Sequence, residues 1–308
     1  MRNTFVKTLQ SLAIKDKRIM LLTADLGYSA FEEFIETLPQ QYINMGVAEQ
    51  NMTGVAAGLA MEGYIPVIYS IVPFVTMRNF EQIRNDIAYQ KLNVKIVGVG
   101  AGFSYGPYGH THHGIEDIAV MRAIPEMVVI APGDPTEVRL ATNAMMTHAG
   151  SVYLRLGKAG EPILHKGDPI FEIGKAIVMT EGTDITLIGT STMLDTTMKV
   201  CHELQVKYIS VQTLSMHTIK PIDAASICEA VDRTKHLVTI EEHGIVGGLG
   251  SAVAEVVVEY GKPINFIRFA IPDRFTKVIG NQEYMRHANG LSVSDIYTRI
   301  MKQFHINI

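Results

Sequence analysis

Short apolar segments rich in β-branched residues alternate with segments of helical spacing along this 308-residue chain. In the first half, the segments that predict strands are Ile19–Thr23, Tyr42–Asn44, Pro66–Ile71, Val94–Val99, Met127–Ala131 and Tyr153–Leu156. Helices are expected near Ala30–Leu38, over Asn79–Gln90 and from Pro135, with Asp134 as its cap. Compact strands that alternate with helices are typical of a doubly wound, mostly parallel sheet. The first half is therefore expected to be an α/β domain.

A second alternating unit follows a stretch without clear periodicity. Its expected strands are Asp184–Gly189, Lys207–Gln212, His236–Glu241 and Asn265–Phe269. Its expected helices are Thr192–Glu203, Asp223–Ala230 and Gly248–Tyr260. The intervening stretch carries Gly and Pro and looks like a linker. The sequence thus predicts two doubly wound α/β domains, residues 1–157 and 175–308, joined by a linker over residues 158–174.

The composition excludes several classes of protein. A net charge of −4 without a Lys/Arg cluster gives no electrostatic basis for binding nucleic acid or an anionic membrane. The N-terminus lacks the apolar core of a signal peptide, and no segment offers about 18 uncharged apolar residues in a row. Cys201 and Cys228 are too few for a disulfide framework and are not spaced as metal ligands. We therefore expect a soluble, cytoplasmic protein.

One carboxylate stands in a small, apolar, glycine-studded stretch between Ile43 and Gly63. Glu49 is followed by alternating Gly and Ala, a pattern that predicts a strand end turning into a tightly packed helix. The residues expected to let another backbone come close are Gly54, Ala56, Ala57, Gly58 and Ala60. From the spacing alone, Glu49 either stabilises the helix through its charge at the N-terminal end of the helix dipole or has a catalytic or binding role.

A glycine-rich loop with three histidines follows the predicted strand Val94–Val99. The loop, Gly100–Gly114, leaves the carboxyl end of that strand, which is where open α/β sheets bind ligands. His110 and His112 would share a face of an extended segment, but His113 would point away, and no local carboxylate or thiol completes a zinc site. The imidazoles therefore either exchange hydrogen bonds or protons with a polar substrate or simply bond the backbone of the loop.

These two regions together resemble one family. The segments that carry the resemblance in the first half are Met45–Asn51, Gly63–Pro66, Gly109–Gly114 and Arg122–Met127. They are similar to the pyrimidine-binding domain of thiamine-diphosphate enzymes, with transketolase and 1-deoxyxylulose-5-phosphate synthase as the most similar members. In the second half, Lys220–Asp223 and Thr239–Ser251 resemble the C-terminal domain of those enzymes. The resemblance extends over nearly the whole chain.

The resemblance implies that three residues bind the cofactor. In this family a glutamate hydrogen-bonds N1′ of the thiamine pyrimidine and favours the imino tautomer that takes the C2 proton; Glu49 matches that glutamate. Phe74 matches the aromatic residue that stacks on the pyrimidine ring, with plain core packing as the alternative. Asp25 matches the aspartate of an Ala-Asp-Leu segment near the cofactor, although an aspartate after a strand is also a common turn residue.

The resemblance also implies contacts with substrate. His112 matches a histidine that contacts donor or acceptor oxygens, so it is expected to be catalytic together with Glu49. His110 and His113 are further candidates for substrate binding at less fixed positions. Lys158 stands where the family has the arginine of a phosphate clamp, and lysine can hold phosphate only as a point charge.

The expected reaction is transfer of a two-carbon ketol unit to an aldose or a modified sugar. Tyr108 stands where transketolases carry an aspartate that contacts a sugar hydroxyl, and a family histidine that binds phosphate is absent from the segment Val99–Gly102. A bulky phenol in place of an anionic acceptor should change hydroxyl recognition. The acceptor is therefore expected to be a modified sugar, such as a nucleotide-linked one, in place of the usual pentose phosphate.

The Gly-Asp-Gly motif with which these enzymes hold the diphosphate and Mg²⁺ is missing. The Gly-Asp pairs of this chain, Gly133-Asp134 and Gly167-Asp168, are each followed by proline and do not fit. No metal ligand is therefore expected here. The resemblance implies that the N-terminal section of a split transketolase supplies the Mg²⁺ site, in a heterotetramer of two chains of each kind with thiamine diphosphate at their interface.

Two alternatives remain open from the sequence. One is the β subunit of a 2-oxoacid dehydrogenase, which shares the architecture and the glutamate. The other is a non-catalytic subunit of the same fold, because a fold does not determine a function.

Overall fold

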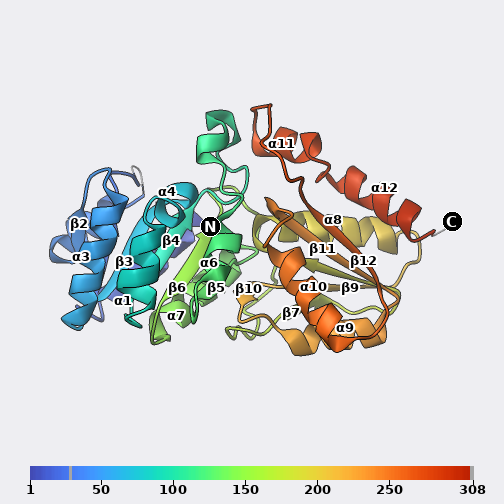
Figure 1. Ribbon diagram of the computed structural model, residues 1–308, viewed down its shortest axis with the longest axis horizontal. Helices are drawn as coiled ribbons and strands as arrows, with labels where there is room; N and C mark the ends of the chain where they lie inside the picture. The colour runs from blue at the N-terminus through green and yellow to red at the C-terminus, as the bar shows by residue number, and fades with distance from the viewer. Residues whose placement is uncertain (28–29, 306–308) are drawn as a thin grey trace.

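Six strands of the first half and one strand from the second half, β10, form a seven-stranded sheet. In the computed structural model, which describes residues 1–27 and 30–305, its strand order is β10-β5-β6-β4-β3-β1-β2 (Figure 1). These strands are β1 (Ile19–Thr23), β2 (Tyr42–Asn44), β3 (Ile65–Ile71), β4 (Lys95–Val99), β5 (Val128–Ile130), β6 (Val152–Leu156) and β10 (Thr218–Lys220). All neighbouring pairs are parallel except β10 with β5. The expected doubly wound α/β domain is confirmed.

Helices cover both faces of this sheet, because successive strand residues point to opposite sides. Leu21 packs in one buried cluster with α1 (Arg2–Ala13) and α7 (Pro135–Thr147), whereas Leu22 packs in another with α3 (Glu49–Met61) and α6 (Asp117–Ala123). Asp134 caps α7 by accepting the Glu137 N–H, as predicted. Shorter helical segments are α2 (Glu32–Thr37), α4 (Val72–Thr76), η1 (Pro39–Gln41), η3 (Gly106–Tyr108) and η4 (His110–His112).

The second half forms a five-stranded sheet in the order β12-β11-β8-β9-β7, with β7 antiparallel to β9. Its strands are β7 (Ile177–Thr180), β8 (Ile185–Gly189), β9 (Val211–Ser215), β11 (His236–Gly244) and β12 (Asn265–Ile271). Its helices are η5 (Ser191–Met193), α8 (Leu194–Gln205), α9 (Ala224–Arg233), α10 (Leu249–Tyr260), α11 (Gln282–Ala288) and α12 (Val293–Gln303). This half is the second α/β domain that the sequence predicts.

One hydrophobic core joins the two halves. Ile118 and Met121 of α6 belong to the same buried cluster as Leu249 and Val253 of α10. Strand β10 strengthens the connection, because it lies late in the chain yet pairs with β5 at the edge of the first sheet (Figure 1). The part of the junction formed by α6 and α10 is therefore packed as an interior.

Several expected elements differ from those observed. Strand β9 (Val211–Ser215) begins four residues after the start of the expected Lys207–Gln212. The apolar residues before it belong to a turn in which Tyr208 is almost fully exposed with φ 61°. The expected helix Asn79–Gln90 is instead α5 (Phe80–Gln82) followed by a π-helical turn, Ile83–Ala88. The observed elements that lie outside those expected from the sequence include β7, β10, α4, α6, α11 and α12.

The expected linker has no helix or strand between Leu156 and Ile177. It is nevertheless fastened to the first half, since Asp134 accepts the backbone N–H groups of Leu164 and His165 at 2.8 and 3.3 Å. The proposed boundaries at 157 and 175 remain a prediction, because β10 crosses this division.

Two further features concern the environment of the protein. Cys201 is buried and Cys228 is partly buried, and both are free thiols. Across residues 1–27 and 30–305, no helix is both long and apolar enough to cross a membrane.

Candidate active site

Glu49 is the first residue of α3, at the carboxyl edge of the first sheet. Its side chain is only 3% exposed. Its carboxylate accepts a hydrogen bond from Ser70 Oγ at 3.3 Å, and Nη1 of Arg78 donates to both carboxylate oxygens at 3.2 Å. The sequence analysis did not anticipate Arg78, which lies 29 residues further along the chain. A buried carboxylate is therefore held beside a half-exposed cation.

The two glycines of α3, Gly54 and Gly58, do not act as expected within this chain. Among the described residues, no atom outside the adjoining helix backbone lies within 4 Å of the Cβ that Gly54 or Gly58 would carry, and both glycines are exposed. The residues that pack α3 on the core are instead Met52, Ala56 and Ala57. The expected close approach of another backbone at the two glycines is therefore wrong for the contacts within one chain.

Phe74 on α4 lies directly beside this ion pair. The Arg78 guanidinium carbon is 4.0 Å from the centre of the Phe74 ring, and the His112 ring lies edge-on to Phe74 with centres 5.1 Å apart. Burial and the nearby Arg78 charge lower the pKa of His112. His112 is therefore neutral at pH 7 and can both donate and accept hydrogen bonds. The structure thus brings Glu49, Phe74 and His112 together.

The glycine-rich loop continues this line of side chains toward Lys158. The Tyr108 ring is 5.3 Å from His112 and 5.9 Å from Tyr105, and Lys158 Nζ lies 4.9 Å over the Tyr105 ring. Burial raises the pKa of Tyr105, so its hydroxyl stays protonated at neutral pH. Aromatic contacts therefore connect the predicted cofactor-binding residues to Lys158, and Tyr105 is a member of this line that the sequence analysis missed.

The loop is anchored to the second half through Glu242. The Phe103 N–H and the Thr192 hydroxyl each donate to the Glu242 carboxylate at 2.9 Å, and Arg286 forms an ion pair with it. Gly102 has φ +60° and a Cβ there would stand 2.6 Å from the Glu242 carboxyl group, so only glycine fits. The position of the histidine loop therefore depends on both halves of the chain.

The other two histidines are placed differently from His112. His113 is buried, donates from Nε2 to the Gly106 carbonyl at 3.2 Å and packs edge-on to Phe103. His110 is exposed, and its ring centre lies 5.8 Å from that of Phe275. The geometry of His113 favours the interpretation in which it bonds the loop backbone, whereas His110 remains accessible.

Asp25 lies at the carboxyl end of β1, on the same sheet edge as Glu49. It has φ 52° and exchanges two hydrogen bonds of 3.1 Å with Asn44, one from each residue to the other. A cavity of about 280 Å³ adjoins it, lined in part by Tyr42 and Phe31. Asp25 therefore lines a hollow on this edge together with apolar and aromatic side chains.

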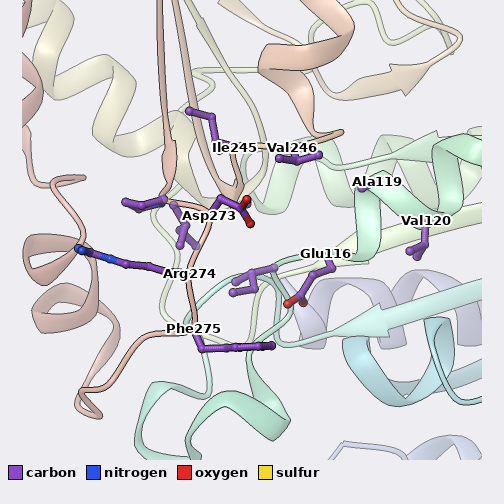
Figure 2. Close-up of a pocket in the computed structure, with 12 residues that line it drawn as sticks. Glu116, Ala119, Val120, Ile245, Val246, Asp273, Arg274 and Phe275 are labelled. Atoms are coloured by element: carbon purple, nitrogen blue, oxygen red, sulfur yellow. The ribbon is translucent and has the colours of Figure 1, made fainter.

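A separate cavity of about 550 Å³ lies between the two halves (Figure 2). Glu116 and Phe275 lie on one side of it and Ile245 and Val246 on the other, while the side chain of Arg274 points away. Burial and the neighbouring Asp117 raise the pKa of Glu116. Glu49, Phe74 and His112 are not among the residues that line it, so this cavity is distinct from the candidate active site.

Asp134, Glu137 and His165 bring potential metal-ligand atoms within 4.8 Å of one another. Their atoms already have partners, since Glu137 accepts from Gly133 N–H, from Ser215 Oγ at 2.7 Å and from His165 Nε2 at 2.9 Å. Hydrogen bonds to His165 and Ser215 keep the pKa of Glu137 low in spite of burial. This cluster therefore fastens the linker and β9 to α7.

The fold and this site define a class of protein. A doubly wound α/β domain followed by a second, mostly parallel α/β domain is the architecture of transketolase-type thiamine-diphosphate proteins. The family descriptions "transketolase, pyrimidine binding domain" and "transketolase, C-terminal domain" match residues 1–160 and 174–296. The chain belongs to the transketolase family.

Individual relatives extend this finding. The chain is 39% identical to a transketolase C-terminal section of Methanocaldococcus jannaschii, over 98% of this chain and 96% of that protein. It is 37% identical to a 6-deoxy-6-sulfo-D-fructose transketolase subunit of a Clostridium species, over 96% and 92% of the two chains. Among solved structures, it is similar to "Split gene transketolase, inactive beta4 tetramer", with a TM-score of 0.89, 36% identity and coverage of 100% and 98%.

Proposed function

We propose that this chain is the pyrimidine-binding subunit of a split, thiamine-diphosphate-dependent transketolase. In this role it takes part in the transfer of a two-carbon ketol unit to an aldose or modified sugar. The observation that carries the proposal is that the buried Glu49 carboxylate and the Phe74 ring, at the carboxyl edge of the sheet, both contact the same Arg78 guanidinium. The same edge of an open α/β sheet is the usual place for a bound ligand.

The residues present fit the pyrimidine of thiamine diphosphate. A planar group with N–H donors, the Arg78 guanidinium, lies on the Phe74 ring and bonds the Glu49 carboxylate. An aminopyrimidine ring is also planar and offers nitrogen-borne hydrogens to a carboxylate. When bound, thiamine diphosphate would supply the nucleophilic carbon that accepts and passes on the ketol unit. Glu49 and Phe74 would hold its pyrimidine, and Asp25 would lie nearby on the same edge.

The remaining site residues would handle the substrate. Neutral His112 can bond a carbonyl or hydroxyl oxygen from either side of its ring. Lys158 offers a positive charge for an anionic group at the far end of the sugar, and exposed His110 offers a further hydrogen bond. His113 would act on the substrate only through the loop that it supports.

We infer that the acceptor or donor is a modified sugar. Tyr108 is 64% exposed and lies over His112, so a substrate entering along this line would meet a phenol face. Relatives named for 6-deoxy-6-sulfo-D-fructose and for apulose 4-phosphate, the latter from Phocaeicola vulgatus and 36% identical over 88% of this chain, are split transketolase subunits. Both named sugars carry an anionic group that a lysine such as Lys158 could hold.

A partner subunit completes this proposal. The ligands for Mg²⁺ and the diphosphate are expected on an N-terminal-section subunit, in a heterotetramer of two chains of each kind. The exposed face of α3 supports contact with another chain, because Gly54 and Gly58 present no side chain there and Met61 is exposed beside them. Free cysteine thiols agree with a reducing compartment such as the cytoplasm.

The test is a cofactor-binding and activity measurement on the complex with the N-terminal-section subunit. Glu49→Gln should abolish binding of thiamine diphosphate with Mg²⁺ by calorimetry, or lower ketol transfer from fructose 6-phosphate by about 100-fold or more. Glu126→Gln is the control, since this exposed glutamate pairs with exposed Lys91 across the surface. Turnover of pyruvate alone would favour a 2-oxoacid dehydrogenase subunit. Absence of cofactor binding by the wild-type complex would leave the non-catalytic alternative.

A further inference from the structure

Arg78 touches every side chain that is proposed to hold the pyrimidine. It donates to both carboxylate oxygens of Glu49 at 3.2 Å, and its guanidinium lies 4.0 Å from the Phe74 ring centre. Burial is the larger cause of the lowered pKa of His112, and the Arg78 charge lowers that pKa further. Among the residues that the structure describes, it is the cation paired with Glu49. A single side chain thus uses the hydrogen-bond acceptor and the stacking surface together.

We propose that the Arg78 side chain occupies the pyrimidine slot, the space between the Glu49 carboxylate and the Phe74 ring. The Arg78 guanidinium must leave this slot before the cofactor can bind. This inference rests on the proposed function of Glu49 and Phe74. The guanidinium and the aminopyrimidine are both planar and both donate hydrogen bonds through nitrogen, so they satisfy the same two partners. Two planar groups cannot occupy the same face of Phe74 while bonding the same carboxylate, and binding is therefore an exchange.

The burial of Glu49 explains why a chain without cofactor needs such an occupant. A carboxylate that is 3% exposed has little access to water, and its other described partner is the single Ser70 hydroxyl at 3.3 Å. An unpaired buried charge is strongly unfavourable. Arg78 keeps the carboxylate paired until another N–H donor replaces it.

The position of Arg78 allows it to leave. Its side chain is 47% exposed and rises from the segment between α4 and α5, outside both helices. Its neighbour Asn79 is fixed, because Asn79 donates to Thr53 Oγ1 at 2.7 Å and is fully buried. The backbone can therefore stay in place while the flexible Arg78 side chain rotates into solvent, where a guanidinium is well hydrated.

The exchange makes a quantitative prediction about affinity. If the slot is free in about a tenth of molecules, the apparent dissociation constant is about tenfold above the intrinsic value. Arg78→Ala should remove this competition and tighten binding of thiamine diphosphate by about tenfold. Arg78→Lys keeps the charge but lacks the planar fork, so it should compete less well and give an intermediate affinity.

The experiment is calorimetric titration of the complex with thiamine diphosphate and Mg²⁺, with Arg84→Ala as the matched control. Arg84 is exposed and bonds the neighbouring Asn85, so its removal should not change affinity. Tighter binding by Arg78→Ala supports the exchange. Equal or weaker binding by Arg78→Ala overturns it, since Arg78 would then be indifferent to the cofactor or one of its ligands.

Two further measurements separate this inference from the proposed function. In the chain without its partner, Arg78→Ala should lower the melting temperature by about 2–4 °C relative to Arg84→Ala, because Glu49 loses its counter-charge. In a crystal structure of the loaded complex, Arg78 should have left the Phe74 ring, and a guanidinium still stacked there refutes the exchange. If the wild-type complex binds no cofactor, both proposals fail; if it binds and only the Arg78 results disagree, the exchange alone fails.

Discussion

Replacement of Asp117 by asparagine should be among the most damaging conservative changes in this chain. Asp117 begins α6, and its Oδ2 accepts from Arg155 Nε at 2.8 Å and from the Tyr153 hydroxyl at 2.6 Å. Asp117 and Arg155 are both fully buried. Arg155 also donates to the carbonyls of Gly114 and Glu242, at 2.8 and 3.0 Å, so the pair supports the base of the histidine loop and the contact between the halves.

The magnitude follows from the burial and separation of the two charges. Unit charges about 4 Å apart attract by about 4 kcal/mol at an effective dielectric constant of about 20. Removing one partner of a buried pair typically costs about 3–5 kcal/mol, because the other charge is left without compensation. An asparagine gains no new bond in return, since Asp117 Oδ1 has no hydrogen-bond partner among the described residues. We therefore expect Asp117→Asn to lower the free energy of unfolding by about 3–5 kcal/mol.

Urea denaturation of the purified chain, followed by circular dichroism, measures this difference. Asp195→Asn is the matched control, because Asp195 pairs with exposed Lys199 one helical turn away and should lose only about 0.3–0.5 kcal/mol. The double variant with Arg155→Met should be less destabilised than the sum of the two single variants. A loss below about 1 kcal/mol for Asp117→Asn would refute this account of the buried pair.

Two other predictions concern the second half and the linker. Burial raises the pKa of Glu241 from 4.5 to about 7, although two backbone N–H groups at the start of α10 donate to it. Between pH 4.5 and about 7 the Glu241 carboxyl therefore binds a proton more readily in the folded chain than in the unfolded chain. The contribution of protonated Glu241 to the free energy of unfolding is lost as pH rises through about 7. Glu241→Gln should gain stability relative to the wild type between about pH 5 and 8 in urea denaturation; a constant difference would contradict this. Asp134→Ala removes the cap of α7 and the acceptor of two linker N–H groups, so it should lose about 1–3 kcal/mol and speed tryptic cleavage within residues 158–174. Unchanged cleavage and stability would show that the linker is held by other contacts.

The architecture could be predicted from sequence because local signals and burial agree over most elements. The strands β1, β4 and β6 are short, fully buried runs between helical segments, and both periodicity and length favour strands there. Strand β9 was misplaced because its buried residues include Gln212, Thr213 and Ser215, whereas the preceding apolar residues lie in a turn. Tertiary context overrides hydrophobicity at that point.

The candidate site could be predicted only in part. Glu49, Phe74 and His112 were expected from resemblance, and the structure brings them together. Their cofactor and substrate roles remain predictions. Arg78 could not be inferred from spacing, because its contact with Glu49 depends on the turn between α4 and α5 and on the parallel pairing of β3 with its neighbours. The available signal was an arginine next to a buried stretch, and this pattern does not distinguish Arg78 from an ordinary surface arginine.

The late arrival of β10 affects how this protein is made. A ribosome adds about 5–20 residues each second, so on the order of ten seconds separate the synthesis of β5 from that of its antiparallel neighbour. During that interval the outer edge of β5 has unpaired backbone groups, which are a template for pairing with other chains. A fragment ending in the linker would keep that edge open permanently, although it contains Glu49, Phe74 and His112. The half of the molecule that carries the candidate chemistry is thus completed as a folding unit only when the other half has begun to emerge.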